Sequence, residues 1–116
     1  MKKSIEPFWW ALFSAGGVIA ALFLPVHILV NGLVIPLAGI EAPRYEASLA
    51  LARHPLTRLY LFGLISLSLF HWAHRFRFTL YDGLQLKHLD QLIAVLCYGS
   101  AIFGTLAAGY VLFFRL

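Results

Sequence analysis

The chain has 116 residues, of which 61% are hydrophobic and only 12% are charged, and its mean hydropathy is +0.83. Soluble domains carry about 25% charged residues, so this composition predicts an integral membrane protein without an extramembrane domain large enough for a nucleotide, a flavin or an iron–sulfur cluster. The formal net charge of +4 is ordinary for charged membrane loops, and we do not expect nucleic-acid binding.

The first apolar run predicts a membrane span over about residues 8–36. Glu6-Pro7 precedes it, and proline suits the first turn of a helix. Trp9 and Trp10 follow, where aromatic residues are typical of a membrane interface. Small residues four apart make one side of this span smooth and predict close packing against another helix; they are Gly16 with Ala20 and Gly17 with Ala21.

The rest of the chain predicts a short surface helix and two further spans. Between residues 39 and 57 the sequence is too polar to cross a membrane, and Ala42-Pro43 and His54-Pro55 limit a short surface helix there. Apolar runs predict spans over about 58–78 and 91–114, joined through a turn at Asp82-Gly83. The expected fold is all-α, a single membrane-anchor domain over residues 1–116 with three transmembrane helices.

Charge suggests an orientation for these spans. Three spans place the N-terminus and the connection between the second and third spans on one side of the membrane. All three lysines, Lys2, Lys3 and Lys87, fall on that side. Because positive charge is enriched on the cytoplasmic side, we expect a cytoplasmic N-terminus and a C-terminus on the opposite, periplasmic side.

A polar cluster ends the second span and is the strongest candidate for a functional site. His71 and His74 lie three residues apart, on one helical face, and Arg75 follows. The topology places them at the same depth as Trp9 and Trp10. Flat apolar surface with several N–H donors suits the head group of an isoprenoid quinone, and histidine can also transfer protons.

Each of these residues also has a simpler interpretation. Trp9 and Trp10 can be interface anchors, and the two histidines can hydrogen-bond to lipid headgroups or to backbone. Arg75 can mark the positive side or meet an anionic lipid or a partner's carboxylate. Haem ligation by His71 would need a facing ligand at matching depth. His27 lies toward the opposite side, where we expect it and Asn31 to form interhelical hydrogen bonds.

The sequence resembles the D subunit of the four-subunit bacterial quinol:fumarate reductases over nearly its whole length. The opening pattern of that family has Glu-Pro, then Trp and a Phe–x–Ala–Gly–Gly turn. The matching residues here are Glu6-Pro7, Trp10, Phe13, Ala15-Gly16-Gly17, Pro25, Pro36-Leu37, Tyr45-Glu46, Arg58, His74-Arg75 and Asp82. Two departures stand out: His71 is additional, and Phe78 and Tyr81 occupy a stretch that is often richer in histidine in the family.

The resemblance implies a membrane anchor in the bacterial inner membrane that serves anaerobic fumarate respiration. Its implied partners, besides membrane lipid, are a second membrane-anchor subunit, an iron–sulfur subunit, and a flavoprotein subunit. Flavin and iron–sulfur clusters would belong to those partners only. The implied cofactor of the anchor is menaquinol, without haem, at a site including Trp10 and His74, with Trp9, His71 and Arg75 as weaker candidates. We expect the carboxylate of this site to come from the second anchor.

Two alternatives remain beside this interpretation. The first is a haem-containing anchor of a succinate dehydrogenase. The second is a protein without a quinone site, either a purely structural anchor or a component of a small transporter.

Overall fold

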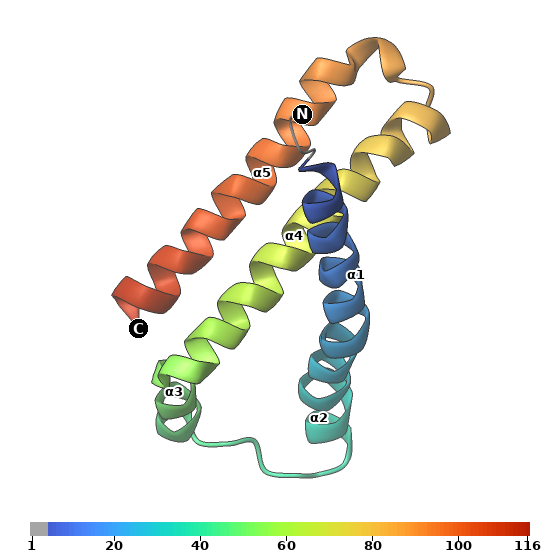
Figure 1. Cartoon of the computed structure of the whole chain (residues 1–116). Coiled ribbons are helices and arrows are strands. Elements are labelled where there is room, and N and C mark those ends of the chain that lie inside the picture. The colour runs from blue at the N-terminus through green and yellow to red at the C-terminus, as the bar shows by residue number, and fades with distance from the viewer. Residues whose placement is uncertain (1–4) are drawn as a thin grey trace.

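The computed structural model describes residues 5–116, and it is helical apart from short connections, with no strand in that range (Figure 1). The first rod comprises α1 (Glu6–Leu29), a π-helical turn η1 (Val30–Val34) and α2 (Ile35–Leu37). A short helix, α3 (Tyr45–Arg53), leads into the long α4 (Pro55–Gly83). A 3-10 turn, η2 (Lys87–Leu89), opens the last rod, which continues as α5 (Asp90–Tyr110) and a π-helical turn η3 (Val111–Arg115).

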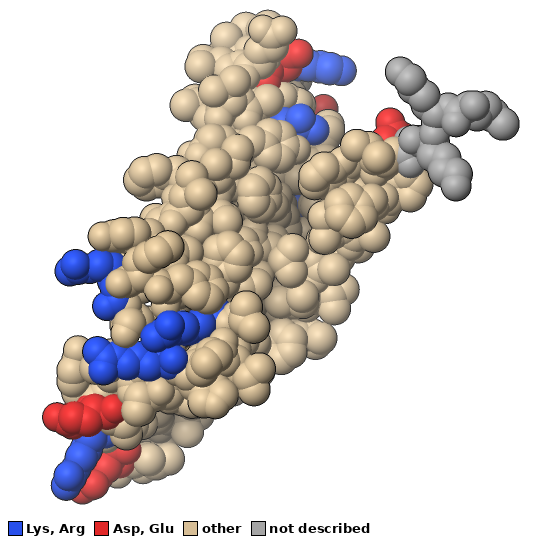
Figure 2. All heavy atoms as spheres, turned by 60° about the vertical axis from the view of Figure 1, so that its left-hand side comes forward, with Lys and Arg blue, Asp and Glu red and all other residues tan. Residues whose placement is uncertain are grey.

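Three of these rods are long and apolar enough to cross a membrane, which confirms the predicted fold class. They cover Glu6–Leu37, Pro55–Gly83 and Lys87–Arg115. Figure 2 shows charged side chains near the top of the visible face and over its lower left part, with a broad uncharged region between the two groups. This distribution is what a hydrocarbon layer requires of three packed spanning helices.

Helix α4 extends at both ends beyond the predicted second span of about residues 58–78. It begins at Pro55 because the His54 side chain caps it, with Nδ1 accepting a hydrogen bond from the Leu56 N–H at 3.2 Å. It ends at Gly83, so Asp82-Gly83 forms the last helical turn and not the reversal itself. The chain reverses over the next residues, where Gln85 adopts a positive φ of 54°.

The smooth side of α1 packs against α4, as the spacing of its small residues predicts. Gly16 is buried, and a Cβ added there would lie 2.7 Å from the Leu67 carbonyl oxygen. A Cβ on Gly17 would lie 2.5 Å from Cε1 of His71. Real Cβ atoms do not approach so closely. At Gly16 the obstacle is backbone, so glycine there allows the two helices their present separation, whereas at Gly17 glycine leaves room for the His71 ring.

Helices α4 and α5 form the small buried core of the described chain. The core residues are Ala73, Ile93, Cys97 and Ala101. Two of them are alanines with no exposed surface, which lets the two backbones approach closely. Cys97 is a free, buried thiol in this core.

The opposite end of the bundle has its own polar contacts. His27 Nε2 lies 2.7 Å from the Tyr60 hydroxyl and joins α1 to α4, which confirms the expected interhelical hydrogen bond. The expectation for Asn31 was wrong, because its Nδ2 donates to the His27 carbonyl within the same rod at 3.0 Å. Arg53 of α3 donates from Nε to the Leu116 carbonyl at 2.9 Å and so ties the surface helix to the end of the third rod.

Candidate functional site

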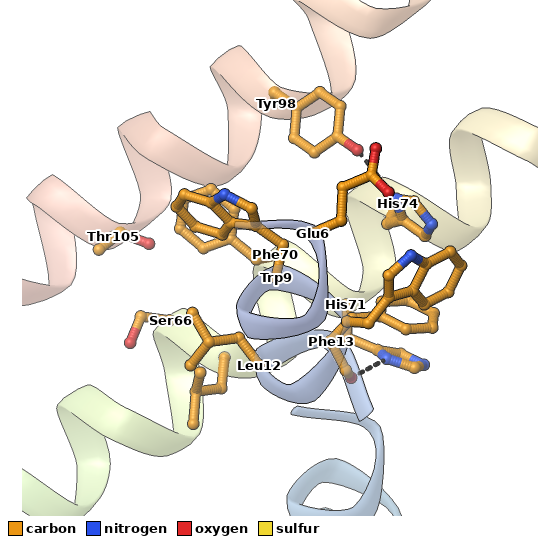
Figure 3. A pocket seen from close by; sticks show the side chains of 12 residues that line it. Glu6, Trp9, Leu12, Phe13, Ser66, Phe70, His71, His74, Tyr98 and Thr105 are labelled. Carbon is orange, nitrogen blue, oxygen red and sulfur yellow. Dashed lines mark hydrogen bonds between the residues drawn. The ribbon is translucent and has the colours of Figure 1, made fainter. Parts of the chain in front are cut away.

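A cavity of about 770 Å³ lies where the start of α1 meets the middle parts of α4 and α5. Figure 3 shows side chains from all three helices around it. The lining residues are Glu6, Trp9, Trp10, Leu12, Phe13, Ser66, Leu67, Phe70, His71, His74, Tyr98 and Thr105. Sites for small organic ligands typically measure about 300–1,000 Å³, so this volume is of the right order for one.

The cavity is polar at one end and apolar along most of its length. Glu6 and His74 lie at the end nearest the start of α1 and the α4–α5 connection. Leu12, Leu67 and Phe70 line the part toward the middle of the spans, together with two hydroxyl side chains, Ser66 and Thr105. From His74 back to Ser66 the cavity follows eight residues of α4, about 12 Å of helix. This polarity matches an elongated ligand with a polar head near the membrane surface and an apolar tail.

His74 sits at the centre of the polar end and contacts residues from all three helices. Its Nδ1 lies 3.0 Å from the Tyr98 hydroxyl on α5. Its ring meets Trp10 of α1 edge-on, with centroids 5.7 Å apart, and Phe13 at 4.5 Å. With Nδ1 engaged by Tyr98, Nε2 is the ring nitrogen left for a ligand.

His71 has a different role, because it is bonded to the backbone of α1. Its Nδ1 lies 2.9 Å from the Phe13 carbonyl oxygen, and a carbonyl only accepts, so Nδ1 carries the proton. The His71 ring also stacks on the Phe13 ring, with centroids 4.3 Å apart and an interplanar angle of 17°. Gly17 leaves the space that this ring fills. The simpler of the sequence-based interpretations, a backbone hydrogen bond, therefore describes His71 as the structure has it.

The two tryptophans line the cavity, and more than half of each remains exposed. Trp9 is 57% and Trp10 58% exposed. Arg75 does not line this cavity; it lines a smaller cleft beside it, together with Trp10, His74 and Asp82. The structure thus brings Trp9, Trp10, His71 and His74 together and leaves Arg75 at the margin. Whether any of them binds quinone stays a prediction.

Sequence reasoning missed four polar side chains of the cavity, which are Glu6, Ser66, Tyr98 and Thr105. The expectation that the carboxylate of the site comes from the second anchor stays a prediction, but this chain also places one at the cavity, because Glu6 begins α1 and lines it. Because Pro7 follows Glu6, sequence reasoning interpreted Glu6 only as part of a helix start. The position of Tyr98 could have been predicted from its distance to the chain reversal at Gln85. His74 lies 11 residues before Gln85 and Tyr98 lies 13 residues after it, so two antiparallel helices place both side chains at a similar depth.

An arginine of α4 borders the polar end outside the cavity. The Arg77 guanidinium carbon lies 4.5 Å from the centroid of the Phe78 ring and 5.2 Å from that of Tyr98. Aromatic faces stabilise a cation at such distances. Positive charge is therefore held beside the Tyr98 ring, close to the membrane surface at which α4 ends.

Together, the fold and the cavity define a three-helix membrane protein with an amphipathic cavity at one end of its bundle. A family model for the D subunit of fumarate reductase matches residues 1–113. The chain is 50% identical over 111 residues to the fumarate reductase D subunit of Mycobacterium tuberculosis, an alignment that covers 96% of this chain and 89% of the relative. It is also 37% identical over 115 residues to that of Vibrio parahaemolyticus, covering 97% and 88%.

The chain therefore belongs to the family of fumarate reductase D subunits, as its resemblance predicted. Membership of this family implies a complex with other subunits. The three membrane-crossing rods agree with a multi-pass membrane protein.

Proposed function

We propose that this chain is a membrane-anchor subunit of a quinol:fumarate reductase and forms part of its menaquinol-oxidation site. The observation that carries the proposal is the cavity, which combines the His74 imidazole and indole N–H groups at its polar end with a largely apolar extension of about 12 Å toward the membrane interior. An isoprenoid quinol has this same division into a polar ring and an apolar tail. The family supplies the remaining context.

In this proposal the residues of the chain bind and orient the quinol ring. Trp10 supplies an apolar wall and an indole N–H donor, and His74 Nε2 meets a ring oxygen. The quinol supplies two electrons and two protons when it is oxidised. His74 accepts one of those protons, because imidazole is a base near neutral pH. This chain performs no chemistry on fumarate.

The more than half exposed faces of Trp9 and Trp10 support a shared site. A ligand in the cavity would be open on that side, so we propose that the wall is completed by the second anchor subunit. The iron–sulfur and flavoprotein subunits would dock at the same membrane face, where the cluster can accept the electrons. This face would be cytoplasmic, with the C-terminus on the periplasmic side of the bacterial inner membrane.

The geometry argues against one haem held by His27 and His71. Tyr60, the partner of His27, lies 11 residues before His71 on α4, which separates the two imidazoles by about 16 Å along the helix. Axial ligands of one iron must lie on its two faces, only a few ångströms apart. A Soret band in the purified complex would nevertheless favour the haem-containing alternative over the present proposal.

The test compares cavity variants with matched controls in the purified complex. His74→Ala should slow menaquinol oxidation at least about tenfold, because general base catalysis alone contributes about 10²–10⁴-fold. Trp10→Leu should slow it by up to about tenfold, because it removes an indole donor, and one hydrogen bond contributes about 0.5–1.5 kcal/mol. Fumarate reduction with an artificial electron donor should persist. The controls are Trp72→Leu and His88→Ala, since both residues are exposed and neither lines the cavity. Unchanged menaquinol turnover in both cavity variants would refute the site.

A further inference from the structure

We propose that Tyr98 and Glu6 carry a quinol proton from His74 to the membrane surface. This inference rests on the proposed function and deepens it by assigning the route by which the proton leaves. It starts from two observations. The Tyr98 hydroxyl is bonded to His74 Nδ1 at 3.0 Å, and Glu6 lines the same cavity.

The arrangement orders the three groups from the cavity outward. His74 and Tyr98 are half-buried, whereas Glu6 is exposed at the first position of α1. Figure 3 shows the Glu6 side chain extending toward the Tyr98–His74 pair. The path thus ends on a carboxylate that reaches both the cavity and water.

The hydroxyl suits Tyr98 for the middle position, because it donates and accepts hydrogen bonds at once. Phenylalanine would pack equally well against the Arg77 guanidinium, which lies 5.2 Å from the ring centroid, so this contact does not require the hydroxyl. The hydrogen bond to His74 and the orientation of Glu6 suit the Tyr98 hydroxyl for passing a proton from one to the other.

Each proton on this route moves from a named donor to a named acceptor. His74 Nε2 takes the proton of one quinol hydroxyl as that O–H bond breaks. The two electrons leave one at a time to an iron–sulfur cluster of a partner subunit, and the proton of the second hydroxyl passes to the carboxylate that we expect from the second anchor. The Nδ1 proton of His74 passes to the Tyr98 oxygen, while the Tyr98 hydroxyl proton passes to the Glu6 carboxylate. Glu6 then releases its proton to water. After the quinone leaves, exchange with water restores the starting imidazole tautomer.

The experiment uses the whole complex, purified in mild detergent, with Glu6→Gln and Tyr98→Phe. Both variants should lower the kcat of menaquinol oxidation at least about tenfold, because a proton-transfer residue typically contributes about 10²-fold or more. Menaquinol affinity and fumarate reduction with an artificial donor should stay within about twofold of the wild type. Glu46→Gln is the matched control, because Glu46 is an exposed carboxylate in the first turn of α3, away from the cavity.

A second readout separates a proton acceptor from a structural residue. In Glu6→Ala, added acetate should restore part of the menaquinol turnover, because a small carboxylate can occupy the vacated position. Acetate should not restore Tyr98→Phe. Rescue is measured within one preparation against its own rate without acetate, so reduced assembly of the variant does not obscure the result.

Three results would overturn the inference. The first is a wild-type rate of menaquinol oxidation in both Glu6→Gln and Tyr98→Phe. The second is a loss of activity that comes entirely from weaker menaquinol binding. The third is that acetate does not restore menaquinol turnover in Glu6→Ala. If Trp10→Leu still impairs menaquinol oxidation in that case, the quinol site stands and only the proton route fails. If the wild-type complex neither binds nor oxidises menaquinol, the proposed function fails with it.

Discussion

The contact between Gly17 and His71 predicts a large response to the smallest possible substitution. In Gly17→Ala, the added Cβ would lie 2.5 Å from Cε1 and 2.9 Å from Nδ1 of His71, so the imidazole must move. Moving it breaks the 2.9 Å bond from Nδ1 to the Phe13 carbonyl. A lost hydrogen bond costs about 0.5–1.5 kcal/mol and overpacking about 1–3 kcal/mol.

These costs are partly offset by the helix propensity of alanine. Alanine is favoured over glycine inside a helix by about 1 kcal/mol. The net loss of unfolding free energy in Gly17→Ala should therefore be about 1–3 kcal/mol. In a His71→Ala background the obstacle is absent, so the same substitution should stabilise the chain by about 1 kcal/mol.

The assay is a double-mutant cycle on the chain in mild detergent. Cys97 is the only cysteine and is buried, so its reaction with a thiol-specific dye during heating reports unfolding. Gly32→Ala is the control, because a Cβ there meets nothing within 4 Å. An equal effect of Gly17→Ala in both backgrounds would refute the reasoning, since the predicted coupling comes entirely from the imidazole.

Two further substitutions test other parts of the bundle. Tyr60→Phe should remove the 2.7 Å bond to His27 and cost about 1 kcal/mol of unfolding free energy, while menaquinol oxidation stays at the wild-type rate; a large loss of turnover would connect this end of the bundle to the cavity. Ala73→Leu should separate α4 from α5, because Ala73 has no exposed surface, and should cost at least about 1–3 kcal/mol. The measurement is the rate at which Cys97 is alkylated at temperatures below unfolding, which should rise in Ala73→Leu. An unchanged rate would contradict the close packing of α4 and α5.

Hydropathy predicted the three spans because a bilayer imposes one length and one polarity on every crossing helix. It underestimated α4, whose ends depend on the cap at His54 and on a reversal at Gln85 that apolar runs do not record. The small residues of α1 predicted its packing face because only close contact between backbones makes such a face useful. They did not identify which side chain would fill the space above Gly17.

Topology alone brought Trp10 and His74 to one depth, because two antiparallel spans return the chain to the same membrane surface. Glu6 and Tyr98 needed more than this. A carboxylate next to proline at a helix start is common, so its orientation toward a cavity becomes visible only in three dimensions. Asn31 shows the same limit: an amide in a span can bond to its own helix, and sequence cannot distinguish that from a bond to a neighbour.

The two hydrogen bonds between α1 and α4 also restrict how these helices can move. A single bond would act as a pivot, about which α1 could turn on its long axis or tilt away. One bond joins His71 of α4 to Phe13 of α1, and the other joins His27 of α1 to Tyr60 of α4. They lie near opposite ends of the contact between the two helices. Sliding or screw rotation of α1 would have to break both at once. The indole of Trp10 therefore keeps one orientation about the long axis of α1. A change in lipid thickness should tilt α1 and α4 together as one rigid body.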